Sequence, residues 1–259
     1  MKKSIFYLLV FGLVTLYVNA NAQDVAIGVR GGVSIPNLTG GSSLNNPLNT
    51  GYSSRLGPDA GVFADFQFSS LFSLQPMVEY SSQGGKKDGF QAFPTPAEAA
   101  GYYEEQHQTP PAYLYANYDS QAKLNYLMIP VLAKFGFTFP GSPWRIYIDA
   151  GPFVSFLLNA HQVTTGSSEF YADPAGKEPL TAFGTQSFDN TQNIKDQLHS
   201  TDVGVEGNLG IAYKIKRSSI FIEGGGNYGF LNIQKGTANG KNETGAGTAD
   251  IGYAYAFGK

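Results

Sequence analysis

A strict alternation of apolar and polar residues runs through the segment 202–215, DVGVEGNLGIAYKI. One set of alternate residues is apolar or glycine throughout, whereas the other includes Asp202, Glu206 and Lys214 together with Gly, Asn and Ala. Because successive side chains of a β-strand point to opposite faces, this period of two predicts a strand with one apolar face and one polar face. A fold for this chain must place two different environments on the two sides of a sheet.

Seven further segments share this period, so the sequence predicts eight strands. The seven segments are 25–35, 59–68, 72–81, 126–137, 145–158, 219–230 and 248–259. Each is close to the roughly 9 to 11 residues that a tilted strand needs to cross a bilayer. The connections alternate between short ones (69–71, 138–143, 216–218) and long ones rich in Gly, Ser, Asn and Pro (37–54, 84–121, 160–200, 235–245). This alternation is typical of outer-membrane barrels, and an even number of strands places both termini on the short-turn, periplasmic side.

The start of the chain has the pattern of an export signal. Lys2 and Lys3 precede an apolar run over 5–18, and Ala20-Asn21-Ala22 forms a small-x-small cleavage site. We therefore expect a cleaved signal peptide over 1–22 and a mature domain over 23–259. An uncleaved anchor is the alternative, and the shortness of the apolar run argues against it.

The rest of the chain contains no run of 18 apolar residues, so a transmembrane helix is not expected. Only helices and closed barrels satisfy every backbone group in lipid, so a mature chain in the membrane must form a closed barrel. The expected mature chain carries 15 basic and 20 acidic residues, which argues against a nucleic-acid partner. The absence of Cys excludes disulfides, thiolate metal sites and Cys nucleophiles.

The composition of the polar faces indicates which side of the barrel faces inward. Only 14% of the residues are charged, against about 25% in ordinary soluble domains. The polar faces hold Gly, Ala and Ser with few long charged residues, which suits a narrow lumen better than a surface in water. We therefore expect the apolar faces to contact lipid. A soluble lipocalin-like barrel, with the two faces exchanged, is the alternative.

The charged residues on the polar faces are expected to form a structural network in the lumen. They are Arg30, Asp65, Glu79, Lys123, Lys134, Asp149, Glu206, Glu223 and Asp250. Buried charges persist only when they are paired and hydrogen-bonded. Strand direction places Lys134, Asp149 and Glu223 near the periplasmic end, and it places Arg30 mid-barrel near Glu79 and Glu206. An ion or solute path through the lumen is the alternative role for these residues.

Aromatic residues concentrate in the long connection 84–121. They are Phe90, Phe93, Tyr102, Tyr103, Tyr113, Tyr115 and Tyr118. Exposed tyrosines mark contact surfaces, so one interpretation is a docking surface for a protein partner or a glycan. The other is that these rings pack against the connection 160–200 and close the barrel mouth.

The three histidines, His107, His161 and His199, fall in predicted long connections. His161 and His199 lie near the two ends of one connection, close to Asp202, which would allow a metal site or an Asp-His pair for hydrolysis. A metal site needs about four ligands, and the sequence offers three here. We therefore expect no catalytic residue, no metal and no cofactor.

The order and spacing of four strands resemble a known family. The segment YLMIPVLAKFGF (126–137) is similar to the Leu-x-Ile-Pro-x-Leu-x-Lys strand of the PorT-like outer-membrane β-barrel family of Bacteroidota. AGPFVSFLL, DVGVEGNLGIAYKI and GVRGGVSIPNL resemble the fifth, sixth and first strands of that family. One departure is Met128, where members often carry Glu. The resemblance implies a barrel in the outer membrane, and its namesake branch takes part in protein export by the type IX secretion system. It supplies no catalytic motif.

These observations predict an eight-stranded, antiparallel, up-and-down transmembrane β-barrel that is monomeric and embedded in outer-membrane lipid. We expect a non-enzymatic scaffold or recognition element that acts through its extracellular loops, with a protein-secretion accessory as one version. A narrow channel for small solutes and a surface hydrolase that uses the loop histidines are the alternatives.

Overall fold

The computed structural model describes residues 24–40, 46–236 and 240–257. The predicted signal peptide 1–22 lies outside the described residues, as do 23, 41–45, 237–239 and 258–259. No helix among the described residues is both long and apolar enough to cross a membrane.

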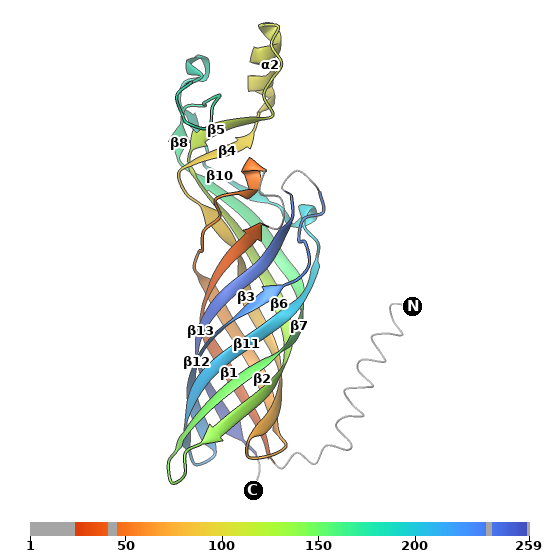
Figure 1. Ribbon diagram of the computed structural model, residues 1–259, viewed down its shortest axis with the longest axis vertical. Coiled ribbons are helices and arrows are strands. Elements are labelled where there is room, and N and C mark those ends of the chain that lie inside the picture. The colour runs from red at the N-terminus through yellow and green to blue at the C-terminus, as the bar shows by residue number, and fades with distance from the viewer. Residues whose placement is uncertain (1–23, 41–45, 237–239, 258–259) are drawn as a thin grey trace, which may run out of the picture.

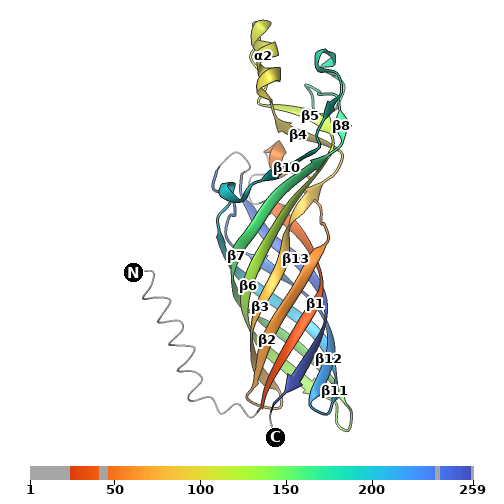
Figure 2. The same ribbon diagram turned by 180° about the vertical axis from the view of Figure 1, so that it is seen from behind.

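Eight long antiparallel strands close into one barrel, which Figures 1 and 2 show as a tall cylinder of tilted strands. They are β1 (Asp24–Gly40), β2 (Gly57–Gln67), β3 (Phe72–Lys87), β6 (Asp119–Thr138), β7 (Trp144–Thr165), β11 (Thr201–Ile215), β12 (Ser218–Gly229) and β13 (Asn242–Ala256). Each strand pairs with the next one in this series, and β13 pairs with β1 to close the ring. The predicted fold class is therefore confirmed.

The strands continue beyond the predicted segments at the end opposite the short turns. β6 already begins at Asp119 and β7 reaches Thr165, so the predicted connections 84–121 and 160–200 are too long at their ends. The apolar alternation fades in stretches such as HQVTT (161–165), while the ladder of hydrogen bonds goes on. A strand needs apolar side chains only where it contacts lipid, and for this reason the sequence pattern stops before the strand does.

The residues 88–118 and 166–200, which we call the extracellular lobe, lie mostly above the barrel rim (Figure 1). The lobe contains β4 (Phe90–Pro94), α2 (Ala97–Glu105), β5 (Tyr113–Asn117), β8 (Ser167–Ser168), η2 (Thr181–Phe183), β9 (Gln186–Ser187), β10 (Asn190–Asn193) and η3 (Lys195–Gln197). β4 pairs with β5, and β10 pairs with β7 of the barrel. A short η1 (Pro47–Asn49) lies between β1 and β2.

Apolar side chains cover the outer face of the barrel, as the sequence predicts. Leu209 is 66% exposed and Ile251 is 60% exposed, which lipid would cover. Aromatic rings contact one another at the short-turn end, including Phe72 with Phe135 and Trp144 with Tyr213. Such a belt is expected where the barrel meets the membrane interface.

The lumen is filled by bulkier side chains than we expected. Four aromatic rings inside the barrel lie on glycines of the neighbouring strand. The directly paired residues are Phe63 with Gly28, Phe153 with Gly204, Tyr147 with Gly210, and Phe221 with Gly252. A Cβ atom at any of these glycines would lie within 2.5 Å of the ring. The inward glycines therefore create the space that lets large rings fill a narrow lumen.

Replacement of an inward glycine should be more damaging than replacement of an outward one. In Gly210→Ala the new Cβ would lie 2.2 Å from the Tyr147 ring, whereas in Gly224→Ala its nearest neighbour is the Thr248 carbonyl at 3.7 Å. Overpacking costs about 1 to 3 kcal/mol, so Gly210→Ala should lose that much stability and Gly224→Ala almost none. Urea unfolding in lipid, followed by the fluorescence of the single tryptophan Trp144, measures both. Equal losses would show that ring-on-glycine packing is not what holds the lumen.

Candidate functional site

The guanidinium of Arg30 lies mid-barrel and binds three glutamates from three other strands. It donates to Glu79 on β3 at 2.5 Å, to Glu206 on β11 at 2.8 Å and to Glu223 on β12 at 2.7 Å. No side chain of these four is more than 2% exposed. Charge-assisted hydrogen bonds of this kind are strong, so Arg30 links four strands across the lumen. We call these four residues the Arg30 cluster.

One member of the cluster lies at a different level from the predicted one. The sequence analysis placed Glu223 near the periplasmic end with Lys134. In the structure Glu223 pairs across the strands with Asp250, and Asp250 pairs with Gly32, two residues from Arg30. The tilt of the strands produces this register, and the length of the Arg30 side chain covers the remaining distance.

Polar neighbours extend the Arg30 cluster in the lumen. The Tyr147 hydroxyl donates to Glu223 at 2.7 Å. The Asn208 amide donates to Glu206 at 3.1 Å and to Asp149 at 2.9 Å. By contrast, both carboxylate oxygens of Asp250 are buried without a hydrogen-bond partner among the described residues. Asp250 is therefore the carboxylate of this network that receives the fewest hydrogen bonds.

Lys134 forms a second, lower cluster. Its ammonium lies 3.8 Å from the centre of the Tyr147 ring, 5.7 Å from that of Phe221 and 6.0 Å from that of Phe63. Cation–π attraction strengthens when the cation is shielded from water, as it is here. Lys134 also donates to Gln75 at 3.0 Å and lies 3.9 Å from Asp65.

Two residues, Asp149 and Lys123, differ from their predicted places or contacts. Asp149 lies opposite Lys134 in the strand register, but its hydrogen bond comes from Asn208. Lys123 is exposed and does not belong to the lumen. It is eleven residues from Lys134 on the same strand, and an odd separation places two residues on opposite faces.

The structure contains one cavity at the barrel mouth and another at its base, and they share no lining residue. The mouth cavity measures about 320 Å³ and the basal cavity about 250 Å³. Arg30 lies between them along β1, because Leu38 lines the mouth cavity and Ala26 lines the basal one. None of the residues of the Arg30 cluster lines either cavity.

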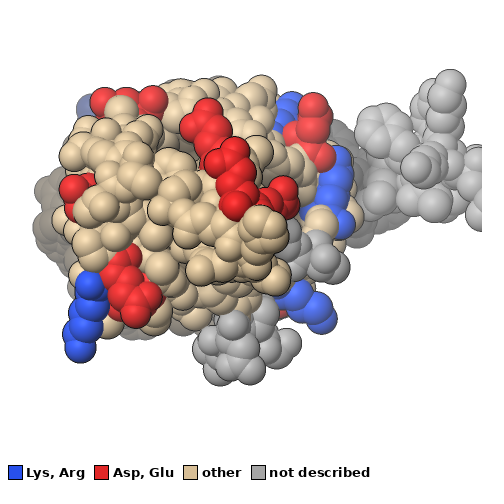
Figure 3. All heavy atoms as spheres, turned by 90° about the horizontal axis from the view of Figure 1, so that it is seen from above, with Lys and Arg blue, Asp and Glu red and all other residues tan. Residues whose placement is uncertain are grey.

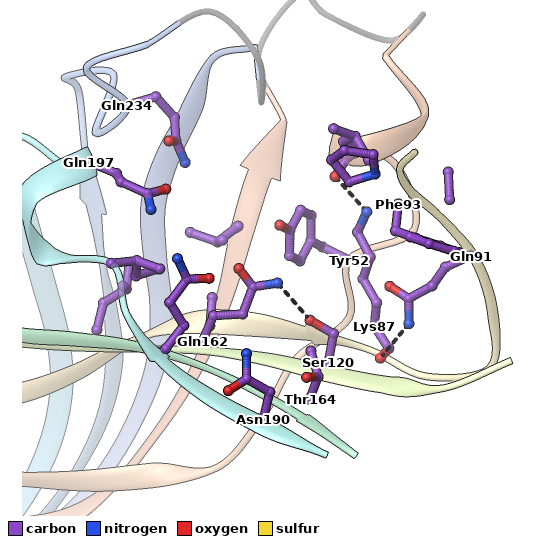
Figure 4. Close-up of a pocket in the computed structure, with 18 of the residues that line it drawn as sticks. Tyr52, Lys87, Gln91, Phe93, Ser120, Gln162, Thr164, Asn190, Gln197 and Gln234 are labelled. Atoms are coloured by element: carbon purple, nitrogen blue, oxygen red, sulfur yellow. Dashed lines mark hydrogen bonds between the residues drawn. The ribbon is translucent and has the colours of Figure 1, made fainter. Parts of the chain in front are cut away.

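The mouth cavity has an apolar floor and walls of amides, hydroxyls and aromatic rings (Figure 4). The floor belongs to a buried cluster that includes Leu38, Leu124, Ile194, Leu198 and Ile233. The polar and aromatic wall residues are Tyr52, Lys87, Gln91, Phe93, Tyr118, Ser120, Gln162, Thr164, Asn190, Gln192, Gln197 and Gln234. We did not predict these amides as site residues. Some of them could have been recognised from the density of Asn and Gln in NTQNIKDQ (190–197).

Among the described residues that line the mouth cavity, Lys87 is the only charged one, and its ammonium already has partners. Its ammonium donates to the Leu48 carbonyl at 2.6 Å and lies 4.6 Å over the Tyr52 ring. Burial lowers the pKa of Lys87 to about 8, and burial raises the pKa of Tyr118 to about 12. Burial also raises the pKa of Tyr52, so both phenols are neutral at physiological pH.

The aromatic residues of the predicted contact surface mostly pack within the extracellular lobe. Phe93 contacts Tyr118, Phe170 and Phe188, and Tyr118 stacks on Phe188 with 4.3 Å between ring centres. Phe90 contacts Tyr115 and Tyr171. Tyr102 contacts Tyr103 and Phe183. Tyr113 is half-buried on β5. These contacts join 88–118 to 166–200, as in the interpretation that the rings pack against the connection 160–200.

The described contacts do not include the alternative grouping of His161, His199 and Asp202. His161 is part of β7, where it pairs with Lys123 and Asn193 rather than lying in a loop. The Asp202 carboxylate is buried and accepts from Thr244 at 2.9 Å and from the backbone N–H groups of residues 203 and 231. Within the described ranges, no group of three or more His, Asp or Glu is placed to hold a metal ion.

Comparison with known proteins identifies the family. The chain matches the outer membrane protein beta-barrel domain over residues 21–235, and it belongs to that family. It is accordingly a β-barrel protein of the outer membrane. No curated protein matches the chain significantly.

Several solved structures are similar in shape at low sequence identity. Neisserial surface protein A is 13% identical with a TM-score of 0.41, covering 89% of this chain and 97% of its own. A major outer membrane protein from Thermus thermophilus is 12% identical with a TM-score of 0.42, covering 90% and 99%. OprG from Pseudomonas aeruginosa is 10% identical with a TM-score of 0.37, covering 92% and 98%.

Removal of Arg30 should destabilise the barrel. Arg30→Met leaves three buried glutamates without their cation, and breaking a buried ion pair costs about 3 to 5 kcal/mol. Urea unfolding in lipid measures the loss, with the exposed Arg217→Met as the matched control. A loss in Arg30→Met that is no larger than the loss in Arg217→Met would contradict this role.

Proposed function

We propose that this outer-membrane protein is a non-enzymatic recognition element that acts on the extracellular side. In this proposal the barrel is a closed anchor, and the extracellular lobe with the mouth cavity contacts the partner. The observation that carries the proposal is the position of the Arg30 cluster between two cavities that share no lining residue. A cavity that opens only outward suits binding rather than passage.

The buried lumen favours this role over that of a channel. An ion that crosses the barrel would have to displace Arg30 from carboxylates at 2.5 to 2.8 Å. Eight strands leave an interior that side chains fill, and here rings on glycines and the charge cluster fill it. The Asp202 carboxylate accepts from Thr244 and from two backbone N–H groups rather than from a histidine, which likewise favours a non-enzymatic role over a surface hydrolase.

Within the family, we propose a place near the PorT-like branch, with membership of a protein-secretion assembly as one version of the recognition role. The segment 126–137 supports this placement through its Ile-Pro and Lys134. Met128, the departure from that pattern, lies opposite Glu79 in the strand register. A glutamate there would add a fourth carboxylate beside Arg30, so its absence leaves a less acidic lumen.

The tip of the lobe provides a test of recognition. Residues 96–111, which include α2, can be replaced by a two-residue Asn-Gly turn because Thr95 and Ala112 already share a backbone hydrogen bond of 3.3 Å. The tagged protein is extracted from outer membranes in mild detergent, and the size of its native complex is compared between the full chain and the deletion variant. We expect a large complex for the full chain and its loss in the deletion. Lys216→Gly, in a periplasmic turn with φ of 55°, is the control and should keep the complex.

Two results would contradict the recognition role. One is that the full chain runs alone as a single barrel. The other is that the complex survives removal of 96–111 and of the rest of the β4–β5 hairpin.

The closed lumen makes a separate prediction. The purified protein should give no steady single-channel conductance in a planar bilayer, because the Arg30 cluster lies between two cavities that share no lining residue. Stable unitary currents from the unmodified chain would support the channel alternative.

A further inference from the structure

We infer that the mouth cavity is a binding site for an uncharged saccharide. This inference rests on the proposed recognition role and names the class of ligand for it. Four features favour such a ligand: the size of the cavity, its amides without side-chain partners, the absence of carboxylates among its described lining residues, and its ring surfaces.

The cavity is a defined site between the barrel rim and the lobe. Its walls come from β3, β4, β6, β7 and β10 and from the connections on either side of the barrel. Its volume of about 320 Å³ is at the lower end of the roughly 300 to 1,000 Å³ that is usual for ligand sites. This space suits one or two sugar rings, and it is too short for an extended peptide, which advances about 3.3 Å per residue.

Four amides that line the cavity have no side-chain hydrogen bond to any described residue. They are Asn190, Gln192, Gln197 and Gln234. Each amide presents two N–H donors and one carbonyl acceptor. Gln162, by contrast, is held by Ser120 at 3.2 Å, and Gln91 by the Tyr118 carbonyl at 2.6 Å. Figure 4 shows Gln234 and Gln197 on one side of this space and Asn190 on another.

A set of groups that both donate and accept matches a ligand whose groups do the same. Sugar hydroxyls are donors and acceptors at once. A ligand with only acceptors, such as a phosphate or sulfate ester, would pair with the N–H groups of Gln197 and Gln234 but not with their carbonyls. The amides therefore favour a polyhydroxylated ligand over an anionic one.

The charge around the cavity points the same way. No Asp or Glu lines it, and its one cation, Lys87, is held by Leu48 and the Tyr52 ring. Seen from above, most of the extracellular end is uncharged, and the Asp and Glu side chains are scattered over it (Figure 3). Such a surface would not steer a polyanion toward the mouth.

Aromatic and apolar surfaces complete the site. Tyr52, Phe93 and Tyr118 line the walls, and both phenols carry no charge at physiological pH. Their rings have an apolar body with a polar tip, which suits the alternation of C–H faces and hydroxyl edges on a sugar ring. The apolar floor below them excludes water from the ligand.

The test uses the full chain purified in a detergent without a sugar headgroup, because an alkyl maltoside would occupy the site. Saturation-transfer NMR and calorimetry are run with maltose, cellobiose, lactose, mannobiose and diacetylchitobiose. We expect saturable binding of at least one of them. The double variant Gln197→Ala/Gln234→Ala should weaken that binding at least tenfold. The control Gln106→Ala/Gln108→Ala removes two exposed amides of the lobe that do not line the cavity, and it should change nothing.

Three outcomes would overturn the inference. They are no binding by any of these sugars, tighter binding of a sulfated disaccharide than of its neutral counterpart, and unchanged binding in Gln197→Ala/Gln234→Ala. If no sugar binds while the native complex still depends on 96–111, the saccharide site falls and the recognition role stands. If the complex is absent as well, both fall.

Discussion

The Arg30 guanidinium, which three glutamates share, holds the strands of this barrel in one register. Three glutamates from β3, β11 and β12 converge on it, and each would be an uncompensated buried charge without it. Arg30 lies on β1, so the cluster joins β1 to three strands, none of which is its neighbour in the sheet. A slip of one residue in any of these strands would turn its charged side chain into lipid. The ion pairs thus fix the register that the regular backbone ladder alone would leave free.

The packing above and below the Arg30 cluster follows from the same narrowness. Eight strands leave a narrow interior, and four of the large rings in it lie where the neighbouring strand carries glycine. Phe63, Tyr147 and Phe221 use this arrangement below the cluster and enclose the ammonium of Lys134. Phe153 uses it above, next to the apolar floor of the mouth cavity. The barrel is therefore filled between the basal cavity and the mouth cavity, and only the mouth cavity lies at the extracellular end.

Much of the fold could be predicted from the sequence because lipid imposes a simple rule on it. Period-two alternation revealed all eight strands, and the small residues of the polar faces showed which face was inside. The depth of Glu223 could not be predicted, because it depends on strand tilt and on the reach of Arg30. Lys123 was misplaced because the apolar pattern is weak above the membrane.

The candidate site was harder to predict than the barrel. The mouth cavity is built from six strands and several connections, and the amides of 190–197 meet Gln91, Gln162 and Gln234 there only in the folded chain. Tyr102 and its neighbours were recognisable as a group, but a sequence does not say whether such rings face a partner or the segment 166–200. The packing of Phe93 and Tyr118 on Phe188 depends on contacts between two connections with no shared periodicity.

The most direct test is to measure from which side of the outer membrane each cavity can be reached. The chain has no Cys, so single cysteines can be introduced at Asn190 in the mouth cavity and at Ser219 in the basal cavity. Intact cells are treated with a bulky thiol reagent that does not cross the outer membrane. The account predicts that Asn190→Cys is labelled, and that Ser219→Cys is labelled only after the outer membrane is permeabilised. Rapid labelling of Ser219→Cys by a small thiol reagent through the lumen of intact cells would contradict a barrel closed by Arg30.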